Sequence, residues 1–131
     1  DQWIVENDYP QDYVEEQTAI KRAMENFDTL GLCGAYITIE NIPVSFVIAE
    51  KLNEETLDLH FEKALDIADG AYAAINNAFA KYIRDKYPHI RWLNREDDLG
   101  LEGLRKAKLS YNPHHLVEKC WACLLEDGYD Y

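Results

Sequence analysis

The sequence is poor in basic residues, with 13 Lys and Arg against 25 Asp and Glu and a formal net charge of −12. An overall field of that sign repels phosphate, which argues against non-specific binding of duplex nucleic acid. No run of 18 apolar residues occurs, so we expect no transmembrane segment, and the first residues show no signal-peptide pattern.

Cysteine is also scarce, at three residues, and an odd number of cysteines does not suggest a disulfide framework. We therefore expect a reducing, cytoplasmic location. Cys120 and Cys123 have the CxxC spacing, but they lie in a segment that reads as a strand and supply only two of the four ligands of a structural zinc. His60 stands alone, and His114 and His115 diverge on an extended chain, so we expect no metal site.

At 131 residues the chain has the size of one domain, and we expect a single domain over residues 1–131 with a loose acidic lead-in over 1–11. The first residue is Asp1, which suggests a piece of a longer protein. Residues 1–80 hold 16 acids and 4 Lys or Arg, whereas residues 81–108 hold 8 Lys or Arg and 5 acids. This local positive region could hold an anionic group, although a solvated surface explains most such charges.

The first half of the chain predicts one helix followed by an antiparallel meander. Apolar residues at helical spacing indicate a helix over residues 13–30, which Gly31 ends. Three strand-like runs follow at 35–40, 44–52 and 56–64. In the last run we expect one apolar and one polar face, with Leu57, Leu59 and Phe61 on the first and Asp58, His60 and Glu62 on the second.

The second half predicts a helix over 71–87, a strand over 89–94, a helix over 99–111 capped by Asp97 or Asp98, and a closing strand over 114–126. The order is therefore α-β-β-β-α-β-α-β. It indicates an α+β fold with a mostly antiparallel mixed sheet flanked by helices, as in the central part of the GNAT acyltransferase fold. A ferredoxin-like or other α+β sheet would give a similar order.

The stretch from 94 to 113, "NREDDLGLEGLRKAKLSYNP", carries charges of both signs where the strand after the crossover helix ends. Ligands commonly bind at such strand ends. Gly100 and Gly103 each cost about 1 kcal/mol within a helix, which suggests a close approach. The alternative is a capped surface helix with internal ion pairs. The residues that we expect to contact substrate are Asn94, Arg95, Arg105, Lys106 and Lys108.

These residues also carry a resemblance. "WLNREDDLGLEGLRKAKLSYNPHHLVEK" resembles the signature of the phosphatidylglycerol lysyltransferase C-terminal domain family, and the likeness extends more loosely over about residues 31–120. The resemblance implies a GNAT-like fold related to aminoacyl-transferring enzymes such as the Fem-type peptidyltransferases. Members usually have two GNAT-like halves, and this chain resembles the C-terminal half only. The implied partners are the N-terminal half or, through the face left exposed, a second copy.

The resemblance leads to two hypotheses. In the first, an acyl or aminoacyl group passes from an activated donor to an amine or hydroxyl, with Glu96 or Asp97 accepting a proton and Arg95 or Tyr111 stabilising charge. In the second, the chain is a non-catalytic module that binds an anion or completes a tandem protein.

The identity of the donor is constrained by one loop. An acetyl-CoA user of this fold binds pyrophosphate at the start of the crossover helix, where this chain reads "DIADGA". Only Gly70 and Ala71 fit that role, and Asp66 and Asp69 would repel phosphate. Acetyl-CoA is therefore disfavoured as a cofactor, and aminoacyl-tRNA or another acyl donor is compatible.

Overall fold

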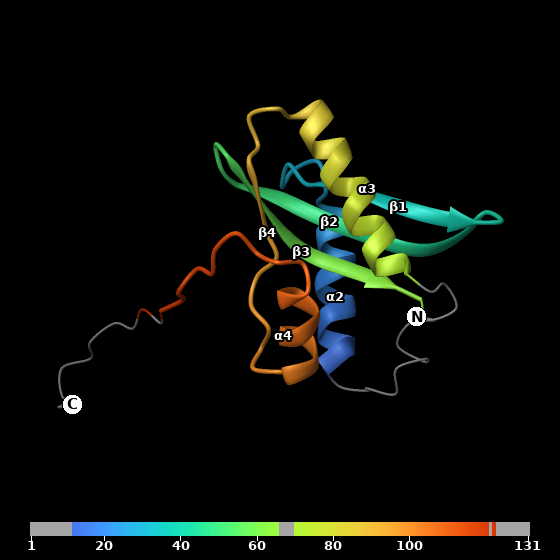
Figure 1. Ribbon diagram of the computed structural model, residues 1–131. Coiled ribbons are helices and arrows are strands. Elements are labelled where there is room, and N and C mark those ends of the chain that lie inside the picture. The colour runs from blue at the N-terminus through green and yellow to red at the C-terminus, as the bar shows by residue number, and fades with distance from the viewer. Residues whose placement is uncertain (1–11, 66–69, 121, 123–131) are drawn as a thin grey trace, which may run out of the picture. The chain divides into compact units, whose positions relative to one another are not determined.

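The computed structural model describes residues 12–65, 70–120 and 122, which excludes the expected lead-in over 1–11. The chain divides after Glu96 into two compact units, which are described separately. The elements of the first unit are α2 (Asp12–Glu25), β1 (Cys33–Ile39), β2 (Ile42–Asn53), β3 (Thr56–Ala64), α3 (Ala71–Lys86) and β4 (Trp92–Asn94) (Figure 1).

The sheet has the order β1-β2-β3-β4, with antiparallel pairing among the first three strands and parallel pairing between β3 and β4. A parallel neighbour requires a crossover connection, which α3 supplies. Glu40 and Asn41 connect β1 to β2 with φ values of 49° and 65°, the conformation of a two-residue type I′ turn. The expected α+β fold with a mostly antiparallel mixed sheet is confirmed.

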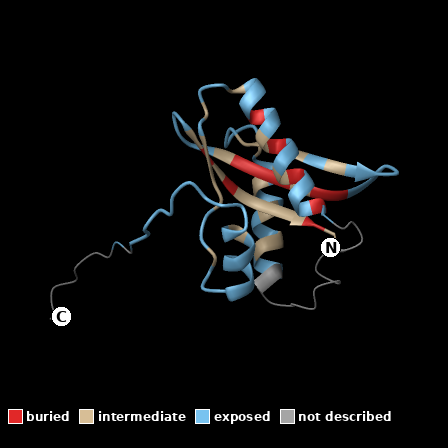
Figure 2. Ribbon diagram, in the orientation of Figure 1, coloured by how far each residue is buried: buried red, intermediate tan, exposed pale blue. Residues whose placement is uncertain are grey.

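The core lies between the sheet and α3. Val47 on β2 and Ile75 and Phe79 on α3 are each 1% exposed, and Leu57 and Leu59 of β3 belong to the same cluster. Figure 2 shows the buried residues along β2 and on the side of α3 that faces the sheet. α2 lies on the opposite face of the sheet (Figure 1), where its Glu16 carboxylate is 2.9 Å from the ammonium of Lys63 on β3.

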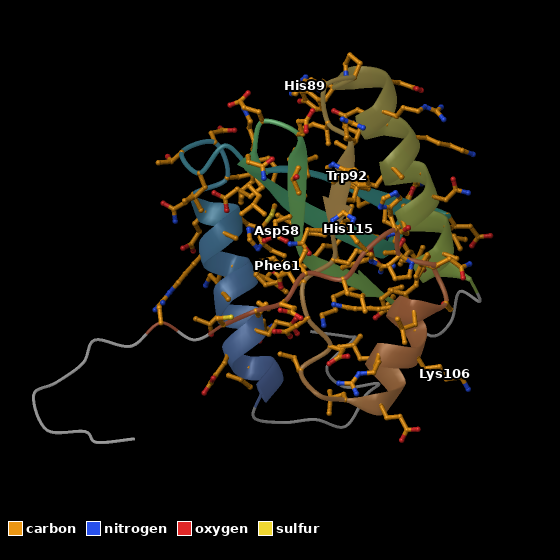
Figure 3. All side chains as sticks on the ribbon, turned by 60° about the vertical axis from the view of Figure 1, so that its left-hand side comes forward. Asp58, Phe61, His89, Trp92, Lys106 and His115 are labelled. Atoms are coloured by element: carbon orange, nitrogen blue, oxygen red, sulfur yellow. The ribbon has the colours of Figure 1, made fainter. Side chains whose placement is uncertain are left out.

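β3 contains a bulge, and the alternation of side chains predicted for this strand is therefore wrong after His60. Leu59 pairs with Ala49 and Phe61 pairs with the preceding residue of β2, Ile48, so His60 is an extra residue in β3. Because one inserted residue reverses every side chain after it, Phe61 joins the face of Asp58, and Glu62 moves to the α3 face. In Figure 3 Asp58 and Phe61 lie on the side of β3 toward α2.

Two expected elements of the first unit differ in length. α2 ends at Glu25 rather than at Leu30, because the side-chain amide of Asn26 donates to the Arg22 carbonyl and the backbone continues in tight turns. β4 is confined to its last three residues, Trp92–Asn94. Within the described residues, no helix has both the length and the apolar character that a bilayer crossing requires.

The second unit begins at Asp97 and contains α4 (Glu102–Leu109), which is shorter than the predicted helix over 99–111. Leu99 and Gly100 have φ values of 51° and 74°, so the backbone there is left-handed and Gly100 serves a turn. Asp97 and Asp98 do not cap α4, whose N-cap is Leu101. Their carboxylates instead accept the backbone N–H groups two residues later, as in Asx turns.

The predicted closing strand over 114–126 is wrong over residues 114–120 and at residue 122, which have no strand structure. Leu116 and Val117 are 75% and 68% exposed, so alternation of side chains buries no face there. The remaining positions, among them Cys123, lie outside the described residues.

Gly34 offers a test of the close approach between β1 and β2. A Cβ atom at this position would lie 2.6 Å from the backbone oxygen of Val47 on β2. Gly34→Ala should therefore lower the free energy of unfolding by about 2 kcal/mol, measured by urea denaturation.

The matched control is Gly103→Ala in α4, where no atom lies within 4 Å of the added Cβ. This change should leave stability unchanged or raise it by up to about 1 kcal/mol. Equal effects of the two substitutions would contradict the described approach of β1 to β2.

Candidate functional site

The candidate site lies where β4 leaves β3. The two strands pair only between Thr56 and Trp92, Leu57 and Leu93, and Asp58 and Asn94, whereas β3 continues to Ala64. The residues after Asn94 contact β3 through side chains instead of backbone pairing. Arg95 reaches Glu62 on the α3 face, and Glu96 reaches His60 on the other face.

On the face opposite α3, His60 lies between two carboxylates. Its Nδ1 is 2.9 Å from Oε1 of Glu96, and its Nε2 is 2.9 Å from Oε2 of Glu50 on β2. The three side chains are 31%, 40% and 44% exposed, in the order His60, Glu96 and Glu50. The group is therefore accessible to solvent at both ends and partly screened at its centre.

The electrostatics of this group favour a protonated imidazole. A carboxylate oxygen accepts hydrogen bonds and cannot donate them, so both ring nitrogens satisfy their neighbours only when each carries hydrogen. Partial burial lowers the pKa of His60, but the hydrogen bonds to Glu96 and Glu50 and the nearby charge of Asp58 outweigh it. The pKa of His60 is consequently raised above its ordinary value of 6.5.

Neighbouring residues hold Glu96 in place. Glu50, Asp58 and Asn94 form one row across β2, β3 and β4. The side-chain oxygen of Asn94 accepts the backbone N–H of Glu96 at 3.0 Å. This turn, with a φ of 53° at Glu96, directs the carboxylate back toward β3.

Asp58, His60 and Glu96 also place one ligand-type atom each within 4.8 Å of one another. Ligand atoms around a bound zinc ion are closer, at about 3.3 Å, since each bond is about 2.0 to 2.1 Å long. Both ring nitrogens already contact carboxylate oxygens. We therefore interpret this group as a hydrogen-bonded histidine and not as a set of metal ligands.

On the α3 face, Arg95 forms a largely shielded ion pair. Its Nη2 donates to Oε1 of Glu62 at 2.6 Å, and the two side chains are 24% and 10% exposed. The other oxygen of Glu62 accepts from Nδ2 of Asn76 on α3 at 3.2 Å. These contacts connect the residue after β4 to β3 and, through Glu62, to α3.

In the second unit, acids and cations pair locally. Arg105 donates to both carboxylate oxygens of Asp98, and with the Gly100 N–H it lowers the pKa of Asp98 to about 2. The ammonium of Lys119 is 2.7 Å from Asp97 and lowers the pKa of that carboxyl. Lys108 donates to the Asp97 backbone carbonyl at 2.6 Å. Most of the charged side chains described in this unit therefore stabilise the turn that precedes α4.

The structure brings together only part of the predicted site. Asn94, Arg95 and Glu96 gather beside β3, whereas the other predicted residues of the stretch belong to the second unit: Asp97, Arg105, Lys106, Lys108 and Tyr111. Lys106 and Tyr111 are exposed there. Gly70, with a φ of 77°, and Ala71 stand at the start of α3, and residues 66–69 lie outside the described residues. The roles assigned to these residues stay predictions.

Sequence reasoning missed four polar residues around the end of β4: Glu50, Asp58, His60 and Glu62. The alternation of the strand predicts only that His60 lies on its polar face. The available signal was the set of three ionisable residues, Asp58, His60 and Glu62, at alternate positions of β3. Their division between two faces depends on the bulge, which no turn residue marks.

Comparison with known proteins shows which protein family the chain matches. Residues 1–123 match the sequence model of the family described as phosphatidylglycerol lysyltransferase, C-terminal. No protein of curated function matches the chain. A conserved protein of unknown function from Bacteroides thetaiotaomicron is 43% identical, with a TM-score of 0.78 over 88% of this chain. The chain spans only 38% of the length of that protein.

Two more distant structures share the fold. A possible acetyltransferase from Clostridium difficile is 12% identical, with a TM-score of 0.67 over 95% of this chain and 86% of its own. An aminoglycoside N-acetyltransferase solved in complex with CoA is 8% identical, with a TM-score of 0.57 over 90% of this chain and 96% of its own. At such identities the likeness shows a GNAT-type fold and nothing about substrates.

Because Arg95 pairs with Glu62, we expect its substitution to destabilise the protein more than substitution of another arginine near β4. Arg95→Ala should lower the free energy of unfolding by about 2 kcal/mol, because it leaves the shielded Glu62 carboxylate without its charged donor. Chemical denaturation at pH 7 measures this loss.

Arg91→Ala is the matched control, since the Arg91 and Glu55 side chains are 64% and 55% exposed and their charged atoms are 3.7 Å apart. The control should cost less than about 0.5 kcal/mol. If Arg95→Ala proves as mild as the control, Arg95 does not anchor the end of β4.

Proposed function

The chain belongs to the phosphatidylglycerol lysyltransferase C-terminal family, and from this membership we propose that it is an acyl- or aminoacyl-transferase domain. The family and the GNAT-type fold support a transferase-type domain in general. The specific proposal is transfer of the acyl group of an activated donor to an amine or hydroxyl of an acceptor.

The observation that carries this proposal is the early end of pairing between β3 and β4. Six residues of β3, from Leu59 to Ala64, extend beyond the last pair with β4. His60 and Glu62 belong to this stretch, and Glu96 and Arg95, which follow β4, pair with them. Acyl transfer needs a proton acceptor and a group that stabilises the developing oxyanion, and both kinds of side chain are present.

We assign roles to the predicted residues on this basis. Glu96 accepts the acceptor's proton, and Arg95 or the Tyr111 hydroxyl stabilises charge on the acyl oxygen. Asp97 is a weaker candidate base, because Lys119 and the Leu99 N–H already bind its carboxylate. The donor's anionic part contacts the remaining predicted residues: Asn94, Arg105, Lys106 and Lys108.

The donor in this proposal is an aminoacyl-tRNA or another acyl donor, and acetyl-CoA is disfavoured. Asp66 and Asp69 precede α3, and like charges there oppose a pyrophosphate. The proposal includes a cytoplasmic location, which the three cysteines favour, and an N-terminal half as partner, because the chain spans 38% of its Bacteroides relative. Pairing between two copies is the alternative partnership.

A non-catalytic role is the second candidate, and one observation favours it. The two arginines expected to bind an anion each have a carboxylate partner, Glu62 for Arg95 and Asp98 for Arg105. Such pairs stabilise a domain without binding a ligand. In that case the chain completes a larger protein or holds an anion without transfer.

A ligand-binding measurement separates the two candidates. Lysyl-tRNA, chosen from the family's description, should raise the melting temperature of the chain more than uncharged tRNA or acetyl-CoA does. Arg105→Gln should weaken lysyl-tRNA binding about tenfold, the loss expected for one charge-assisted contact.

Arg84→Gln is the control, because Arg84 is an exposed arginine that likewise pairs with an aspartate, Asp85, on α3. It should bind lysyl-tRNA like the unchanged chain. If no donor among aminoacyl-tRNAs and CoA thioesters shifts the melting temperature, the non-catalytic role replaces the transferase proposal.

A further inference from the structure

We propose that His60 holds the proton that moves during transfer, with Glu96 passing it between His60 and the substrates and Glu50 fixing the imidazole's tautomer. The inference rests on the proposed function and deepens it. His60 acts through Glu96 and is therefore a positioning and proton-storing residue, not one that contacts substrate.

The geometry identifies the described state as the proton-loaded one. Both ring nitrogens of His60 are 2.9 Å from carboxylate oxygens, and the arrangement is fully hydrogen-bonded only when both nitrogens carry hydrogen. When one proton leaves, only one of the two carboxylates keeps a donor. The unloaded imidazole then presents a lone pair to the other carboxylate, and this arrangement takes up a proton readily.

Glu50 determines which nitrogen is unloaded. Glu50 belongs to β2, the direct backbone neighbour of β3, whereas Glu96 follows the short β4 in a turn. We assign the retained hydrogen bond to Glu50, because its backbone is paired within the sheet, so Nε2–H continues to donate to Glu50. Nδ1 becomes the basic atom and faces Glu96, much as a carboxylate orients the histidine of a catalytic triad.

The proton balance of the transfer closes with this arrangement. As the acceptor's lone pair attacks the carbonyl carbon, the new bond forms and the acceptor's proton passes to Glu96 and on to Nδ1 of His60. When the bond from the carbonyl carbon to the leaving oxygen or sulfur breaks, the imidazolium returns that proton through Glu96 to the leaving atom. No net proton is gained or lost by the protein.

The charges around His60 suit this task. Glu50 from β2, Asp58 from β3 and Glu96 after β4 all lie near the ring, and together they favour the imidazolium. On the same face, Lys63 is bound to Glu16 of α2, and on the other face Arg95 is bound to Glu62. The exposed ends of Glu50 and Glu96 leave a route to solvent.

An NMR titration of the chain tests the proton-holding arrangement without any substrate. The ring signals of His60 should titrate above 6.5, and the nitrogen shifts of the neutral form should show the Nε2–H tautomer. Glu50→Gln keeps the shape but removes a charge, so it should lower the His60 midpoint by at least about half a pH unit. Glu96→Gln should lower it as well.

Glu40→Gln, an exposed acid at the β1–β2 turn, is the control and should leave the midpoint unchanged. A His60 midpoint at or below 6.5, or one indifferent to both Glu50→Gln and Glu96→Gln, would overturn the inference. A neutral form with hydrogen on Nδ1 would overturn the assigned direction of transfer.

The transfer reaction gives the second readout. Its rate should rise with pH through the His60 midpoint, because only the unloaded imidazole takes up a proton. His60→Gln should lower kcat about 100-fold and abolish this pH dependence, whereas His89→Gln, the exposed control, should keep both. An unchanged pH profile in His60→Gln contradicts the inference. Lack of any transfer beside the expected titration would refute the proposed function alone.

Discussion

Three backbone pairs between β3 and β4 determine the arrangement of the candidate site. Because pairing stops at Asp58 and Asn94, the next two residues are held to β3 by side chains on opposite faces of the sheet. The Arg95–Glu62 and Glu96–His60 contacts take the place of further backbone hydrogen bonds.

These contacts change how the locally positive region of the sequence is interpreted. The positive region of a chain with a net charge of −12 suggested a free surface for an anion. The structure shows that Arg95 and Arg105 neutralise neighbouring acids, and that Asp97 and Asp98 bind backbone N–H groups of their own turn. An anionic donor would therefore compete with Glu62 and Asp98 for these guanidinium groups.

The sequence predicted the elements better than the site. Apolar spacing located the helix at Ala71–Lys86 and the meander, and family-like motifs pointed to the correct fold. Alternation in β3 misplaced Phe61 and Glu62, because a bulge arises from pairing with β2 and leaves no local signal. Asn94, Arg95 and Glu96 were found as neighbours in sequence, but their partners Glu50, His60 and Glu62 lie on other strands. Proximity across strands requires register, which single-strand patterns do not contain.

The central claim is that the parting of β3 and β4 is where the donor binds, and mapping of NMR chemical shifts during lysyl-tRNA addition tests it most directly. The account predicts that signals of His60, Trp92 and Glu96 move together, while those of Asn41 in the β1–β2 turn stay in place. Saturable binding that moves Asn41 but leaves His60 and Trp92 unchanged would contradict it.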